Sequence, residues 1–224
     1  MLKTTKKIKE IYEDIQKKIF YMIPEKWDEL YLYASVIERF GSIETGELFF
    51  YYIPKGILRK NPINVYEIPA KFNLEEAEYL RLVDLLYSKI KELREEFKKI
   101  EKGRTWSNLT ISIKNMRFHI KYDYEDLQNC EYDSYQRHII WRSKYLNQGI
   151  EKVNKEDKEI LKKYYNGQKS LIRTEEYEEQ IYIKDVKNIV DFDTEDYESI
   201  QNVEYVASKN TKKSKNQILM SEDD

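Results

Sequence analysis

The sequence predicts an α+β fold, an antiparallel sheet of about five strands with packed helices in the order α-β-β-β-α-β-β-α. Two long segments, 6–23 and 73–97, place apolar residues at helical spacing. Shorter segments alternate apolar and polar residues and are separated by glycine, proline and asparagine, as strands and turns require. We expect one folded domain at 1–166, a partly ordered acidic extension at 167–206 and a disordered tail at 207–224.

The first element is an amphipathic helix over 6–23, which Pro24 ends because proline cannot continue a helix. Its core face is formed by Ile8, Ile11, Tyr12, Ile15, Ile19 and Met22. Alternating residues then predict three strands, and the glycine-containing stretch FGSIETGE predicts a turn between the first two. The strands are expected at 30–34, 48–53 and 63–68, and the turn at 40–47.

The second helix is the longest predicted element. Asn73 is expected to cap its N-terminus, since Glu76 stands three residues later in the position of a capping box, and Gly103 ends it. The face that we expect in the core carries Leu74, Ala77, Leu80, Val83, Tyr87, Ile90, Leu93 and Phe97.

A β-hairpin is predicted at 106–124, with its turn near Asn115. Apolar residues alternate strictly with polar ones in the phrase FHIKYD, which indicates a strand with one buried face. A helix around 135–146 follows. A shorter helix ends at Tyr165, where the phrase NGQKS interrupts it.

The composition limits the classes of protein to be considered. The formal net charge is −2, from 39 basic and 41 acidic residues, so we expect no direct binding of nucleic acid and no membrane association. No apolar run approaches the ~18 residues of a membrane span. Cys130 is the single cysteine, which precludes an internal disulfide and favours the reducing cytoplasm. The 20 tyrosines favour protein interfaces, or else reflect the base composition of the genome.

Residues 171–206 differ from the rest of the chain. They contain eleven acidic and three basic residues, a local net charge of −8. Apolar residues between the acids predict some strand or short helix, whereas the following SKNTKKSKNQ and the terminal SEDD have the composition of disordered chain. A solvated appendage and a contact with a partner both remain open for this extension.

Seven separated phrases, in this order, resemble those of the YezG/EsaG antitoxin family of small bacterial immunity proteins. The phrases are IPEKWDELYLYA at 23–34, FFYY at 49–52, IPAKFN at 68–73, ELREEF at 92–97, WSNLT at 106–110, YDYEDL at 122–127 and IIWRSKYL at 139–146. The likeness covers about residues 8–165. The acidic extension departs from the family pattern, and so does Asn147, where a glycine is common.

The resemblance implies a cytoplasmic protein that binds a cognate secreted toxin, in a one-to-one complex, and neutralises it. The toxin would be a nuclease of a type VII secretion system, blocked at its active or substrate-binding surface. Because a nuclease binds phosphate in a basic cleft, fixed carboxylates and rigid aromatic side chains suit its inhibition. The candidates for toxin binding are Tyr122, Asp123, Tyr124, Glu125, Asp126, Tyr132 and Asp133.

Other roles are open for some of these residues, since Asp126 could cap a turn and Tyr122 could belong to the core. No catalytic set, metal site or cofactor is predicted, because neither histidine, His119 or His138, stands in a pattern of ligands or beside a nucleophile. The alternative function is an adaptor or chaperone that holds a secreted effector for export. An enzyme is a weaker alternative.

Overall fold

The computed structural model of the protein describes residues 5–39, 43–58, 61–100, 105–115, 117–146 and 153–168. The chain divides into two units, 1–182 and 183–224, and every described residue belongs to the first. The predicted tail at 207–224, and the predicted extension at 167–206 apart from its first two residues, lie outside the described residues.

A five-stranded antiparallel sheet forms the centre of the described fold, as the sequence predicted. Its strands lie in the order β5-β4-β1-β6-β7. In β1, Leu32 pairs with Phe50 of β4 on one side and with Ile111 of β6 on the other. The bounds are β1 Trp27–Ser35, β4 Leu48–Pro54, β5 Ile63–Asn64, β6 Asn108–Lys114 and β7 Arg117–Asp123.

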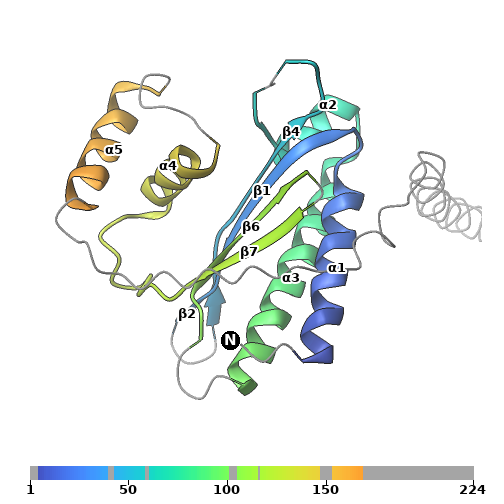
Figure 1. Ribbon diagram of the computed structural model, residues 1–224, viewed down its shortest axis with the longest axis horizontal. Helices are drawn as coiled ribbons and strands as arrows, with labels where there is room; N and C mark the ends of the chain where they lie inside the picture. The colour runs from blue at the N-terminus through green and yellow to red at the C-terminus, as the bar shows by residue number, and fades with distance from the viewer. Residues whose placement is uncertain are drawn as a thin grey trace, which may run out of the picture. The chain divides into compact units, whose positions relative to one another are not determined.

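Two long helices, α1 (Lys6–Met22) and α3 (Glu76–Ile100), cover one face of this sheet and lie side by side (Figure 1). All six residues predicted for the core face of α1 are buried, because an amphipathic helix satisfies its apolar stripe only against another layer. This layer is mainly aliphatic, with Leu30, Leu32 and Ile111 of the sheet facing the helices.

The start of the longer helix differs from the prediction. Asn73 does not cap α3, because it ends the short helix α2 (Ile68–Phe72) in a left-handed conformation with a φ of 53°. Asparagine adopts this conformation more readily than most residues, so the same residue type suits either end of a helix. The helix begins at Glu76, and its buried stripe differs from the predicted one mainly in the first turns. Leu74, Ala77 and Leu80 are exposed, while Tyr79, Val83, Leu86, Ile90, Leu93 and Phe97 are buried.

Two further local predictions were wrong. The strand expected at 63–68 is limited to β5, because the side chain of Asn64 accepts a hydrogen bond from the amide of Tyr66 and starts the 3-10 helix η1 (Val65–Glu67). The turn expected at 40–47 contains a strand, since β2 (Ile37–Arg39) pairs with β3 (Ile43–Thr45) in a separate two-stranded sheet.

The opposite face of the sheet is also covered, by helix α4 (Ser134–Tyr145), which the sequence predicted (Figure 1). Trp141 and Leu146 pack there on Tyr31, Tyr33, Tyr51 and Ile53 of β1 and β4. Helix α5 (Lys155–Gln168) packs on α4 through Ile139, Ile140 and Leu161. The predicted end at Tyr165 was too early, because α5 continues through Asn166 and Gly167, where a side chain at the glycine would meet nothing within 4 Å.

The hairpin of β6 and β7 is confirmed. Phe118, Ile120 and Tyr122 are buried, their polar neighbours are at least partly exposed, and Asn115 makes the turn with a φ of 49°. Its last residue, Asp123, therefore lies where β7 ends and the chain leaves the sheet for α4.

Candidate functional site

The seven candidate residues lie at the end of β7 and in residues 124–133, which we call the β7–α4 segment. This segment is held at several points. Leu127 is buried, the side chain of Gln128 donates to the backbone carbonyl of Glu38 in β2, and the backbone carbonyl of Tyr132 accepts from Arg137 at 2.6 Å. The segment is therefore fixed to both the small sheet and α4.

Two candidate tyrosines pack inside the protein. Tyr122 is only 5% exposed; its ring lies against Phe97 and Trp106, and its hydroxyl hydrogen-bonds that of Tyr12 at 2.7 Å. Tyr132 is half-buried against the α4–α5 cluster and meets Tyr164 edge to face. Tyr122 therefore offers little surface to a partner, whereas Tyr132 keeps part of its ring exposed.

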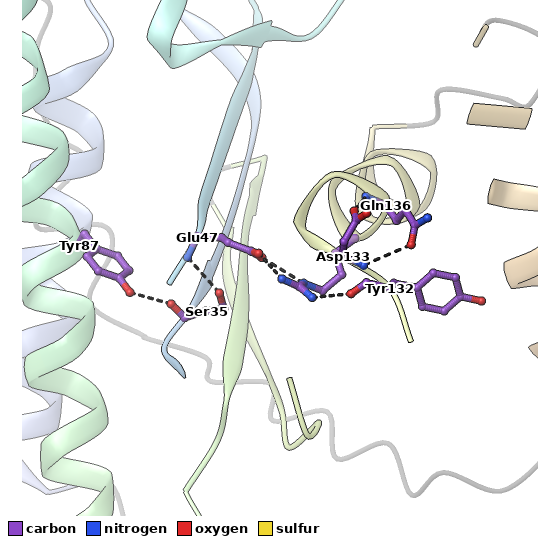
Figure 2. Close-up of polar contacts among 7 residues, drawn as sticks. Ser35, Glu47, Tyr87, Tyr132, Asp133 and Gln136 are labelled. Atoms are coloured by element: carbon purple, nitrogen blue, oxygen red, sulfur yellow. Dashed lines mark hydrogen bonds and ion pairs between the residues drawn. The ribbon is translucent and has the colours of Figure 1, made fainter. Parts of the chain in front are cut away.

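Two candidate acids stabilise local structure. The carboxylate of Asp126 accepts hydrogen bonds from the amides of Gln128 and Asn129 and from the Asn129 side chain at 2.8 Å, and these bonds lower its pKa. Asp133 caps α4 in a capping box with Gln136, which Figure 2 shows. Both carboxylates remain on the surface, but the turn explains the position of Asp126 and the helix cap explains that of Asp133.

The remaining three candidates, Asp123, Tyr124 and Glu125, lie together where β7 ends, and Glu125 is exposed. Asp123 is partly exposed and lies 3.7 Å from the ammonium group of Lys121. Tyr124 packs its ring partly on the main core. Glu125 keeps an exposed surface, while the partial burial of its carboxyl group and the nearby charge of Asp123 raise its pKa. Two acidic side chains, Asp123 and Glu125, thus lie close together beside a tyrosine.

The position of α4 depends on an ion pair that the sequence did not reveal. Arg137 of α4 binds the carboxylate of Glu47, just before β4, with its Nε 3.2 Å from Oε2, and both side chains are almost buried. Their separation by 90 residues in the sequence leaves no local signal of the pairing.

Glu47 is itself fixed from the opposite side of the sheet. Its amide donates to the Ser35 hydroxyl at 3.0 Å, and the hydroxyl of Tyr87 on α3 donates to the Ser35 carbonyl at 2.8 Å (Figure 2). Gly46 makes this approach possible, because a Cβ there would lie 1.9 Å from the Tyr87 hydroxyl and 2.0 Å from the Ser35 carbonyl oxygen.

An aromatic cluster surrounds His138 at the same contact. Its ring stacks on Phe49 with centroids 4.3 Å apart, and its Nε2 lies 3.0 Å from the Tyr51 hydroxyl. Burial, with the nearby charge of Arg142, lowers the pKa of His138 to about 4. The imidazole is therefore neutral at physiological pH, and its ring packs against Phe49.

Within the described ranges, no three His, Cys, Asp or Glu residues converge in a way that could hold a metal ion. No helix in that part of the chain is long and apolar enough to cross a membrane.

The profile of the family described as "Immunity protein YezG-like" matches residues 8–162, which include nearly all of the described fold. The chain belongs to the YezG-like immunity protein family. The predicted membership of the YezG/EsaG family is thereby confirmed, and with it the coarse role of an immunity protein.

Curated YezG-like proteins resemble the chain along most of their own length. The Immunity protein YezG of Bacillus spizizenii is 32% identical over 161 residues, which are 71% of this chain and 94% of that protein. The protein of the same name from Bacillus subtilis is 30% identical over 158 residues, 70% and 98% of the two chains. The Type VII secretion system protein EsaG of Staphylococcus aureus is 30% identical over 146 residues, 64% and 83% of the two chains.

Proposed function

We propose that the protein binds and neutralises a cognate secreted toxin, a nuclease exported by a type VII secretion system, by blocking its active or substrate-binding surface in a one-to-one complex. The observation that carries this proposal is the family match, which extends over both helical layers and the sheet between them. The name of the staphylococcal relative supports the link to type VII secretion. The cytoplasm, where a toxin is made before its export, is the compartment in which this protection is needed.

We further propose that Asp123, Tyr124 and Glu125 face the toxin. The two carboxylates provide the charge that a phosphate-binding cleft attracts, and the tyrosine ring beside them is already partly ordered by the core. Anchoring of the following segment to β2 and α4 lowers the entropy that binding must remove.

Growth of cells that express the toxin encoded next to this gene tests the function. Co-expression of the immunity protein should restore growth, and the purified toxin domain should form a one-to-one complex that lacks nuclease activity. Unchanged killing by the toxin in the presence of abundant folded protein would contradict the proposal. An adaptor or chaperone would instead bind the toxin while leaving its nuclease activity intact.

A charge-matched pair of variants tests the surface. Asp123→Asn with Glu125→Gln should slow association with the toxin and weaken the dependence of the association rate on salt, because surface charges act through a screened field. Glu10→Gln with Glu13→Gln, two exposed acids on α1, removes the same charge elsewhere. Equal association rates for the two double variants at every salt concentration would remove Asp123 and Glu125 from the interface.

A further inference from the structure

The loop that follows β4 presents two adjacent aliphatic side chains to solvent. Ile57 has 105% of its reference exposure and Leu58 has 82%. By comparison, Leu80 and Leu85 on α3 are 39% and 51% exposed. Single exposed leucines are ordinary on protein surfaces, whereas adjacent apolar side chains that stay almost fully exposed are a feature of surfaces that bind a partner.

The base of this loop is fixed although its tip is exposed. The amide of Lys55 donates to the carbonyl of Lys26 at 2.9 Å, and the chain returns from the loop to pair β5 with β4. Pro54 and Pro62 stand at its two ends, where each ring fixes the backbone angle φ. A tip held in this way loses less conformational entropy on binding than a free segment does.

The charge of the loop defines the chemistry of its partner. Lys55 precedes the two aliphatic residues, the sequence continues with Arg59 and Lys60, and no acidic residue occurs between Pro54 and Pro62. A complementary surface therefore has an apolar depression for the tip and carboxylates around it.

We propose that Ile57 and Leu58 anchor the cognate toxin domain by entering such a depression on its surface. This inference rests on the proposed function and adds a second contact to the one at Asp123. The two contacts lie at opposite ends of the sheet, since Pro54 pairs with Trp27 at the start of β1, whereas Asp123 belongs to the end where β1 finishes at Ser35. The nine residues of β1 span about 25 Å, and β4 lies three strands from β7, which adds about 14 Å across the sheet, so the two contacts are about 30 Å apart.

A single toxin domain can reach both contacts along this direction. A standard protein interface covers about 800 Å² on each partner, a patch roughly 30 Å across. The acids Asp123 and Glu125 at one end and Lys55 at the other would favour one orientation of the toxin along the sheet.

Equilibrium binding of the full-length protein to the purified toxin domain tests the anchor. The double variant Ile57→Ser, Leu58→Ser should raise the dissociation constant by about tenfold or more, as for paired interface anchors, with an unchanged melting temperature. The control variant Leu80→Ser, Leu85→Ser also removes two exposed leucine-sized side chains and should change the constant by less than about twofold. Lys55→Glu should slow association, because it places an acid against the carboxylates of the toxin.

Partners of the exposed tip other than the toxin would give different results. If the wild-type protein binds and inhibits the toxin and the Ile57, Leu58 variant does so equally well, the inference is overturned while the proposed function stands. Self-association of the free protein, or sedimentation with phosphatidylglycerol vesicles, that the variant abolishes without weakening toxin binding would also overturn it. A wild-type protein that does not bind the toxin contradicts the proposed function itself, whatever the variants do.

Discussion

Removing the Arg137–Glu47 ion pair should destabilise the contact between α4 and the sheet. The side chains are 14% and 12% exposed, so neither charge is well hydrated once its partner is lost. Breaking a buried pair from one side costs about 3 to 5 kcal/mol. Arg137 retains the Tyr132 carbonyl and both groups keep some contact with water, which favours the lower end of this range.

We therefore expect Arg137→Met and Glu47→Leu each to lower the free energy of unfolding by about 3 kcal/mol. For a folded domain of this size, that loss corresponds to a melting temperature lower by about 6 to 12 °C. The double variant should lose much less than the sum of the single losses, because replacing both charges by apolar groups leaves no unpaired buried charge. Urea unfolding followed by circular dichroism measures all three.

The exposed pair of Glu159 and Lys162 on α5 provides the control. Its side chains are 65% and 57% exposed, so Lys162→Met and Glu159→Leu should each change stability by at most about 1 kcal/mol. Single losses at Arg137 and Glu47 as small as these, or a double variant with fully additive losses, would refute the reasoning that α4 is held by a buried charge pair.

Four further predictions concern neighbouring features. Asp133→Ala should lower the free energy of unfolding by about 1 kcal/mol, because α4 loses its cap. The affinity for the toxin should not change; a large loss of affinity would show that Asp133 belongs to the interface. Gly46→Ala should destabilise the fold by at least about 1 to 3 kcal/mol, since the added methyl group meets the Ser35 backbone; wild-type stability would disprove that close approach. The folded-state pKa of His138, about 4, lies below its ordinary 6.5, so the unfolded chain binds the extra proton first. Stability is therefore fully present above pH 6.5 and is lost as the pH falls toward 4. His138→Phe should remove at most about 3 kcal/mol of that loss, and less where solvent screens the partly exposed ring; equal pH dependence in both proteins would contradict this. Truncation after Gln168 should leave the melting temperature nearly unchanged, because the described members of the three hydrophobic clusters all precede Asn166. Aggregation of the shortened chain would contradict this prediction.

The fold class was predictable because periodicity reports which faces of an element are apolar. The helical stripe of α1 and the alternation in β7 were both confirmed, since each of these elements buries one face on the main core. The alternation in β1 was less informative, because its tyrosines are buried under α4 while its leucines are buried under α1 and α3. A strand covered on both faces carries no polar face to reveal its orientation.

The candidate site was only partly predictable, because burial and hydrogen bonding depend on distant parts of the chain. Tyr122 and Asp123 are neighbours in the sequence, yet one lies in the core and the other is partly exposed, as strand alternation requires. By contrast, nothing near Arg137 in the sequence specifies Glu47 as its partner. The exposure of Ile57 and Leu58 was likewise invisible, since an Ile-Leu pair suits a core strand as well as a loop tip.

The two faces of the sheet have different chemistry, and this difference bears on the proposed interface. The layer under α1 and α3 is mainly aliphatic, whereas the layer under α4 is mainly aromatic and also contains Ile53, Leu146, His138 and the Arg137–Glu47 ion pair. Aromatic and charged contacts tolerate less displacement than aliphatic packing, because rings and hydrogen bonds prefer particular geometries. Since Arg137 also holds the Tyr132 carbonyl at the end of the β7–α4 segment, the same contact that attaches α4 fixes that segment. Docking of α4 and the placement of Asp123, Tyr124 and Glu125, which we propose to face the toxin, are therefore coupled.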